Sequence, residues 1–138
     1  MPYIEWSPRY ATGIARIDAD HENLFMIVNV LYDCRVKHGA EANLTPILTA
    51  LGEYVKKHFI TEEIAMQEAG YPGIDSHIEK HRAFTRRIQR YIEQSNAQPG
   101  KVDAEDLLRL LKHWLTDHVL RSDMDYVPYL KQKATQSG

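Results

Sequence analysis

Apolar residues recur at helical spacing along most of this chain, and this periodicity limits the possible folds more than any other feature. In the first periodic segment the apolar positions are Leu24, Ile27, Val28 and Leu31. Such a stripe is typical of an amphipathic helix that buries one face. The sequence shows no strand-length segment with alternating apolar residues and no internal repeat. We therefore expect an all-α fold.

Turn and capping residues divide the periodic pattern into four helices. Asp18 and Asp103 are the expected N-caps of the first and fourth helices, and Thr45-Pro46 is expected to supply the N-cap and first residue of the second. The predicted helices cover residues 18–38, 45–70, 74–95 and 104–130, between an N-terminal arm (1–17) and a flexible tail (131–138) of a single domain (1–138). Four helices of about 20 residues joined by short loops predict an up-down-up-down four-helix bundle.

Composition and charge exclude several classes of protein. The 138 residues carry a net charge of −2, which gives no reason to expect nucleic acid as a partner. Every apolar run is shorter than the roughly 20 residues that cross a bilayer, and the N-terminal sequence lacks the pattern of a secretory signal. The single cysteine, Cys34, rules out an internal disulfide and suits a reducing compartment. The expected location is the cytoplasm, without a membrane-spanning segment.

Seven histidines provide the main functional signal. They are His21, His38, His58, His77, His81, His113 and His118. Two local pairs stand out, because His58 and Glu62, and likewise His77 and His81, have i, i+4 spacing and share one helix face. Either pair alone is a weak signal, since such spacings arise by chance on many helices, and a single inward histidine is most often satisfied within the core.

The bundle geometry strengthens this signal by bringing side chains of all four helices to one level. Measured from the shared loops, the residues at this depth are His21, His58 with Glu62, His81, and His118. Because buried imidazoles each need a hydrogen-bond or metal partner, this layer predicts a metal site. His38 and His113 fall outside the pattern and are expected on solvated faces.

The fourth helix offers two candidates for a further carboxylate ligand. Asp125 has the better angular match to His118, but it lies about 10 Å along the helix axis. Asp123 is nearer in height, yet it lies about 140° round a regular helix. It would need local unwinding or a π-type widening, which is common at functional sites. Periodicity alone leaves the choice open.

The sequence resembles the hemerythrins, in particular the single-domain bacterial members, over almost its whole length. The resemblance rests on GIARIDADHENLF in the first helix, HFITEEIAM and YPGIDSHIEKHRAF in the middle, and WLTDHVLRSDMDY near the end. The order H…HxxxE…HxxxH…HxxxxD is highly specific, because seven residues with matching gaps rarely arise by chance. It implies seven metal ligands: His21, His58, Glu62, His77, His81, His118 and Asp123. Glu63 is then expected to face solvent or a neighbouring helix.

The resemblance also implies the cofactor, two iron ions (Fe²⁺/Fe³⁺) with an oxo or hydroxo bridge. Both carboxylates would bridge the ions. His77 and His81, joined by His118, would hold one iron. His21 and His58 would hold the other, which keeps an open coordination site for O2.

The positions that line the O2 pocket in hemerythrins correspond to Phe59, Trp114 and Leu115. An aromatic residue and a leucine at this spacing could equally be core, and both interpretations can hold because a pocket wall is core. Tyr126 either supports the ligands of the fourth helix or only packs, and Met66 is expected to be core.

The expected function is reversible O2 binding as a carrier, store or local supply, without catalytic residues and without enzymatic activity. O2 is the ligand, and an O2-consuming client protein would be the partner. The alternatives are an O2 or redox sensor, a di-iron oxidase or nitric-oxide-handling protein, and a structural bundle with incidental histidines. Five histidines favour binding over oxidation, because bundles that activate O2 are usually richer in glutamate. A sensor would need a separate output partner.

Overall fold

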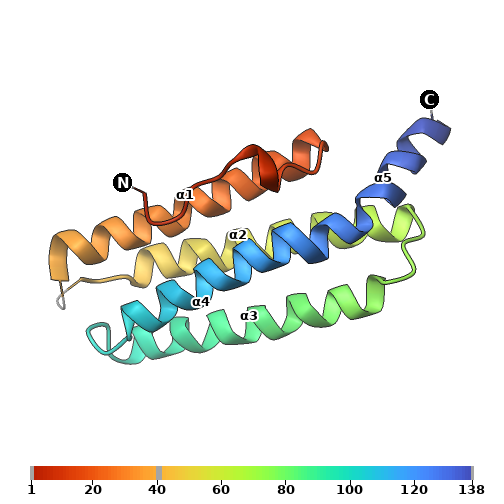
Figure 1. Cartoon of the computed structure of the whole chain (residues 1–138). Coiled ribbons are helices and arrows are strands. Elements are labelled where there is room, and N and C mark those ends of the chain that lie inside the picture. Colours follow the sequence, from red (N-terminus) through yellow and green to blue (C-terminus); the bar gives the residue numbers. More distant parts are fainter. Residues whose placement is uncertain (1, 40–41, 138) are drawn as a thin grey trace.

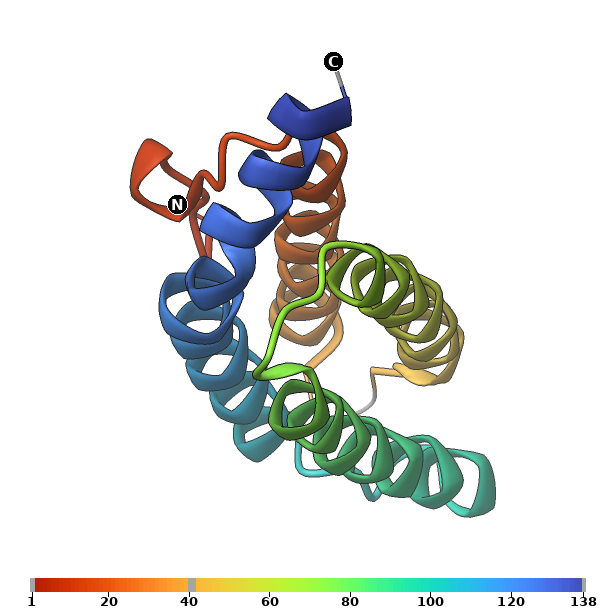
Figure 2. The ribbon, with the colours of Figure 1, turned by 90° about the vertical axis from the view of Figure 1, so that its right-hand side faces the viewer.

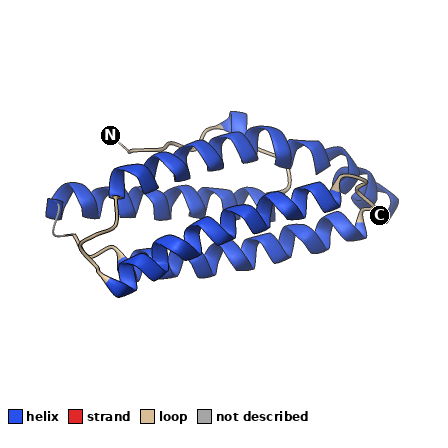
Figure 3. Ribbon diagram, turned by 90° about the horizontal axis from the view of Figure 1, so that it is seen from below, coloured by secondary structure: helices blue, strands red, loops and turns tan. Residues whose placement is uncertain are grey.

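Four long helical segments form the molecule in the computed structural model, which describes residues 2–39 and 42–137. They are α1 (Ala15–His38), α2 (Thr45–Glu68), α3 (Ile74–Ala97), and a fourth segment made of α4 (Ala104–Asp117), the π-helix η3 (His118–Ser122) and α5 (Asp123–Ser137). Successive segments run up and down beside one another around a common interior (Figures 1 and 2). The described residues contain no strand (Figure 3). The predicted four-helix bundle is confirmed.

The first helix begins earlier than predicted. Its N-cap is Ile14, so Asp18 lies inside the first turn and the N-terminal arm is shorter than residues 1–17. The Asp18 carboxylate instead accepts hydrogen bonds from the backbone N–H and the hydroxyl of Thr12, both at 2.8 Å, and from the N–H of Gly13 at 3.2 Å. Asp18 therefore fastens the arm to α1, a role that its capping preference could not reveal. The arm also contains a 3₁₀ turn, η1 (Pro8–Tyr10).

The N-cap predicted for the fourth helix is confirmed, but the one predicted for the second helix is not. Leu44, not Thr45, is the N-cap of α2, so the prediction was wrong by one position, although Pro46 does lie in the first turn. Asp103 is the N-cap of α4 as predicted, and its carboxylate accepts a hydrogen bond from the N–H of Asp106 at 3.1 Å.

The fourth helical segment is longer and less regular than predicted. It continues to Ser137, past the expected end at residue 130, so residues 131–137 are helical. Pro128 lies inside α5, where its ring removes one backbone hydrogen bond and favours a kink. The axis of α5 changes direction and its last turns extend beyond the bundle (Figure 1). Among the described residues, no helix is long and apolar enough to cross a bilayer.

Most of the buried apolar side chains among the described residues form two separate clusters. The larger cluster fills the end of the bundle that holds the α1–α2 and α3–α4 connections, and it includes Phe25, Leu48, Ile88 and Leu111. The smaller cluster lies at the other end and consists of Ile17, Met66, Tyr126 and Val127. Met66 is therefore core, as predicted. Between the two clusters lies a layer of polar side chains.

Candidate metal centre

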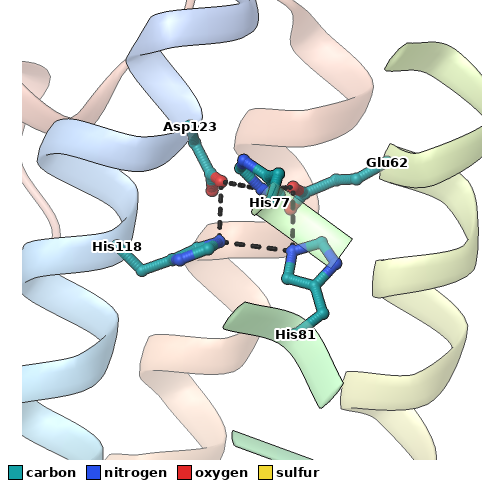
Figure 4. A group of neighbouring side chains, drawn as sticks. All are labelled: Glu62, His77, His81, His118 and Asp123. Carbon is teal, nitrogen blue, oxygen red and sulfur yellow. Dashed lines mark hydrogen bonds and ion pairs between the residues drawn. The ribbon is translucent and has the colours of Figure 1, made fainter. Parts of the chain in front are cut away.

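All seven residues predicted as ligands lie in this polar layer. Each is at most 4% exposed, and together they come from α1, α2, α3, η3 and α5. Their ligand-type atoms form two overlapping groups, in each of which all atoms lie within 4.8 Å of one another. One group contains Glu62, His77, His81, His118 and Asp123 (Figure 4). The other contains His21, His58, Glu62 and Asp123.

Asp123 directs one carboxylate oxygen to each group of histidines. Its Oδ1 lies 2.9 Å from Nε2 of His118 and 3.1 Å from Nε2 of His77. Its Oδ2 lies 3.0 Å from Nε2 of His21. Helical periodicity left the choice between Asp123 and Asp125 open. Asp123 lies inside the cluster, whereas Asp125 is exposed.

Glu62 is divided between the two groups in the same way. Its Oε2 lies 3.5 Å from Nε2 of His77 and 3.7 Å from Nε2 of His81. Its Oε1 contacts Nε2 of His58 and lies 3.4 Å from Nε2 of His21. Both carboxylates thus face two sets of imidazoles with two different oxygens, which is the arrangement that lets a carboxylate bridge two cations.

Several polar atoms of the layer are buried without a hydrogen-bond partner among the described residues. They are Nδ1 of His21, Nε2 of His58, Nε2 of His77, Oε2 of Glu62, and both carboxylate oxygens of Asp123. A buried polar atom without a partner costs about 1–3 kcal/mol. Lone pairs converging from imidazoles and carboxylates fit a cation that accepts both kinds of donor, and iron is such a cation.

The charges within the layer stabilise one another. Burial alone would lower the pKa of His21, but the carboxylates of Asp123 and Glu62 raise it to about 10. The same two carboxylates overcome burial at His77 and raise its pKa to about 9. Burial lowers the pKa of His81 to about 3. Burial opposes ionisation of Glu62 and Asp123, yet the surrounding imidazoles hold the pKa of both carboxyls well below the usual range. Protons and a metal ion therefore compete for the same nitrogens.

The π-helix η3 explains how Asp123 reaches the layer. The N–H of Asp123 donates to the carbonyl of His118, five residues earlier, as in a π turn. This wider turn brings the two residues back to one face, which a regular α-helix would not do. The π-type widening that Asp123 was expected to need is present.

Two of the three predicted pocket residues, Phe59 and Trp114, stack on imidazoles of the layer. The ring of Phe59 stacks on that of His81 with centroids 3.7 Å apart, and the ring of Trp114 stacks on that of His118 at 4.1 Å. Leu115 is 2% exposed. The distance from the ring of Phe59 to that of His58 is larger, 6.2 Å, so the aromatic wall lies mainly over the group of three histidines.

Two further carboxylates contact the outer ring nitrogens of the cluster, and sequence reasoning missed both contacts. Oδ2 of Asp20 lies 2.9 Å from Nδ1 of His58, and Oε2 of Glu63 lies 2.9 Å from Nδ1 of His81. Glu63 thus faces the neighbouring helix α3, one of its two expected environments. Each of these carboxylates is next to a predicted ligand in sequence but contacts a histidine of another helix. Residue spacing along one helix therefore could not predict the contact.

The remaining polar candidates lie outside the predicted ligand set. Tyr126 is fully buried with its ring centroid 5.6 Å from that of His77, and its hydroxyl has no hydrogen-bond partner among the described residues. Burial and the nearby carboxylates of Glu62 and Asp123 raise its pKa. It packs against the layer with its hydroxyl near the carboxylate of Glu62. His38 and His113 are exposed, as predicted.

The fold and the buried cluster define a four-helix bundle built around a candidate metal centre of histidines and carboxylates. Residues 12–130 match the family described as "Hemerythrin HHE cation binding domain". The chain is 30% identical over 137 residues to bacteriohemerythrins of Pseudomonas paraeruginosa and Pseudomonas aeruginosa, covering 99% of this chain and 87% of each relative. It is 28% identical to the bacteriohemerythrin of Methylococcus capsulatus, covering 94% and 98%.

Solved structures give the same result. A wild-type hemerythrin crystal structure superposes with a TM-score of 0.84 at 27% identity, covering 93% of this chain and 98% of that one. The protein belongs to the hemerythrin family.

Proposed function

We propose that this protein binds O2 reversibly at a non-haem di-iron centre. His77, His81 and His118 would hold one iron, His21 and His58 would hold the other, and Glu62 and Asp123 would bridge them. The observation that supports this assignment best is the division of both carboxylates, each with one oxygen toward either group of histidines.

The number of donors favours binding of an external ligand. Five imidazole nitrogens and four carboxylate oxygens fill nine of the twelve positions of two octahedra. An oxo or hydroxo bridge would fill two more. One position would then stay open, on the iron held by His21 and His58. When bound, the iron pair supplies the electrons that make O2 binding reversible.

The protein's own contribution is to position the centre and keep it dry. Phe59, Trp114 and Leu115 are proposed to line the O2 pocket, where apolar side chains exclude water and offer no proton to the ligand. These features favour a carrier, store or local supply for an O2-consuming client, not an enzyme. The proposed setting is the cytoplasm, because the single Cys34 suits a reducing compartment.

An optical spectrum tests the proposal. The protein is loaded with Fe²⁺ without air, exposed to O2, and returned to anaerobic buffer. We expect two iron ions per chain and a visible charge-transfer band that appears with O2 and disappears on deoxygenation, over several cycles. Immediate and lasting oxidation with release of hydrogen peroxide would contradict O2 carriage and indicate an oxidase. Reversible binding that requires a second protein for its effect would instead indicate a sensor.

A further inference from the structure

We propose that Asp20 and Glu63 are positioning residues that act independently, one on each half of the metal centre. Asp20 orients His58 and Glu63 orients His81, and each carboxylate determines how tightly its own half holds a metal ion. This inference rests on the proposed di-metal centre and assigns roles to two residues outside its ligand set.

The contact of Asp20 with His58 is part of a fixed chain of hydrogen bonds. Oδ2 of Asp20 lies 2.9 Å from Nδ1 of His58, and Oδ1 of Asp20 accepts a hydrogen bond from the Tyr54 hydroxyl at 3.1 Å. The side-chain amide of Asn23 in turn donates to the Tyr54 hydroxyl at 3.1 Å. Both oxygens of Asp20 therefore have a partner, so its carboxylate is held in place although its side chain is 26% exposed.

The contact of Glu63 with His81 is the counterpart in the other half. Oε2 of Glu63 lies 2.9 Å from Nδ1 of His81, and the side chain of Glu63 is 29% exposed. Glu63 follows Glu62 directly, so the two adjacent carboxylates on α2 face different atoms. Glu62 contacts the inner Nε2 nitrogens, whereas Glu63 contacts an outer Nδ1 nitrogen.

An acceptor on Nδ1 matters because it selects the tautomer of the ring. An imidazole that donates its Nδ1–H keeps the lone pair of Nε2 free for a metal ion, and a carboxylate acceptor also makes that nitrogen more basic. The inner nitrogens of His58 and His81 are those that face Glu62. Asp20 and Glu63 thus prepare both rings for coordination before any metal enters.

The half formed by His21 and His58 depends on its carboxylate most strongly. Nδ1 of His21 is buried without a hydrogen-bond partner among the described residues. Only His58 in this half is therefore oriented by a carboxylate. This half also has one imidazole fewer than the other, so we expect loss of Asp20 to weaken metal binding more than loss of Glu63.

Titration of the metal-free protein with Co²⁺ tests the proposal without any O2 chemistry. Because the halves differ in histidine number, the two bound ions differ in their absorption bands. We expect wild type to bind two Co²⁺ per chain. Asp20→Ala should weaken only the ion of the two-histidine half, and Glu63→Ala only that of the three-histidine half, each by about 10- to 100-fold. Asp20→Asn and Glu63→Gln keep an acceptor oxygen and should lose less.

Matched controls separate positioning from general effects of charge or folding. Glu22→Gln and Glu53→Gln remove exposed carboxylates from the same two helices and should leave both Co²⁺ affinities unchanged. Each metal-free variant should still unfold cooperatively and above the temperature of the titration, although Asp20→Ala and Glu63→Ala should lose some thermal stability because each leaves a buried Nδ1 without its acceptor. Equal affinities in all variants, or a loss shared by both ions in Asp20→Ala and Glu63→Ala, would overturn the roles proposed here. Fewer than two Co²⁺ bound by wild type would instead overturn the di-metal centre.

Discussion

Glu62 occupies a position where a helix of this bundle would otherwise bury an apolar side chain. Its carboxylate is 1% exposed and contacts imidazoles of α1, α2 and α3. A buried carboxylate is stable only when it is paired with charges or metal ions. The four imidazoles around Glu62 meet this requirement in part, and the proposed iron ions would meet it fully.

Removing one bridging carboxylate should affect both metal positions at once. We expect Glu62→Gln and Asp123→Asn to lower the iron content below two per chain, because each substitution replaces one of the two carboxylate oxygens with an NH2 group and removes the negative charge that faces both metal positions. The measurement is iron per chain after anaerobic loading. Asp125→Asn is the matched control for Asp123→Asn, since Asp125 is exposed two residues further on. An Asp125→Asn variant as depleted of iron as Asp123→Asn would refute the assignment.

At the residue level, the sequence predicted the inner contacts of the cluster but not the outer ones. Five of the seven inner residues share a depth in the bundle, and the spacing of all seven matches a known family, so two separate signals indicate most of them. Asp20 and Glu63 act across helices from positions adjacent to other cluster residues. Their roles depend on side-chain direction between packed helices, which periodicity along one helix does not encode.

The π-helix between α4 and α5 is the element that completes the centre. It adds one residue to a helical turn, and everything after it is rotated relative to a continuous α-helix. Asp123, Tyr126 and Val127 all face the interior as a result. Without this turn the same sequence would direct Asp123 about 140° away from His118.

Inserting one alanine after Leu120 should change the register of everything that follows η3. We expect the far-ultraviolet circular dichroism of the variant to stay helical, while iron content falls because Asp123 is rotated out of the layer by about 100°. Tyr126 and Val127 would leave the smaller apolar cluster, so the free energy of unfolding should also fall by about 2–5 kcal/mol. An insertion variant that still binds two iron ions would show that the register set by η3 is not required.

The elements themselves were predicted with uneven success. The four helices and the cap at Asp103 follow from local rules that act within a few residues. The start of α1 does not, because Thr12 and Gly13 use the Asp18 carboxylate from outside the helix. The extension of α5 to Ser137 also escaped prediction, since residues 131–137 are mostly polar and lack an apolar stripe.

The stability of the whole metal-free protein should depend on pH in a defined direction. The pKa of His21 is raised to about 10 and that of His77 to about 9, so their protonated forms stabilise the folded state fully below pH 6.5. That contribution is lost as pH rises through 9 to 10. The pKa of His81 is lowered to about 3, so its contribution is present above pH 6.5 and is lost as pH falls toward 3.

We therefore expect the free energy of unfolding of the metal-free protein to be greatest near pH 6.5. It should fall by on the order of a few kcal/mol toward pH 10. Denaturant unfolding at a series of pH values measures this. The metal-loaded protein is the control, because neutral imidazoles bind metal and its stability should rise over the same range. A metal-free protein whose stability increases from pH 6.5 to 10 would contradict the assigned charges.

The division of the buried apolar side chains into two clusters has a consequence for the molecule as a whole. The polar layer across the middle of the bundle separates the two apolar clusters, so the two ends of the bundle share little apolar contact. The end that holds Ile17, Met66, Tyr126 and Val127 is the smaller. A metal ion bound in the layer would link the helices at the boundary between the two ends. Metal loading and cooperative unfolding of this bundle should therefore both report how strongly its two ends are coupled.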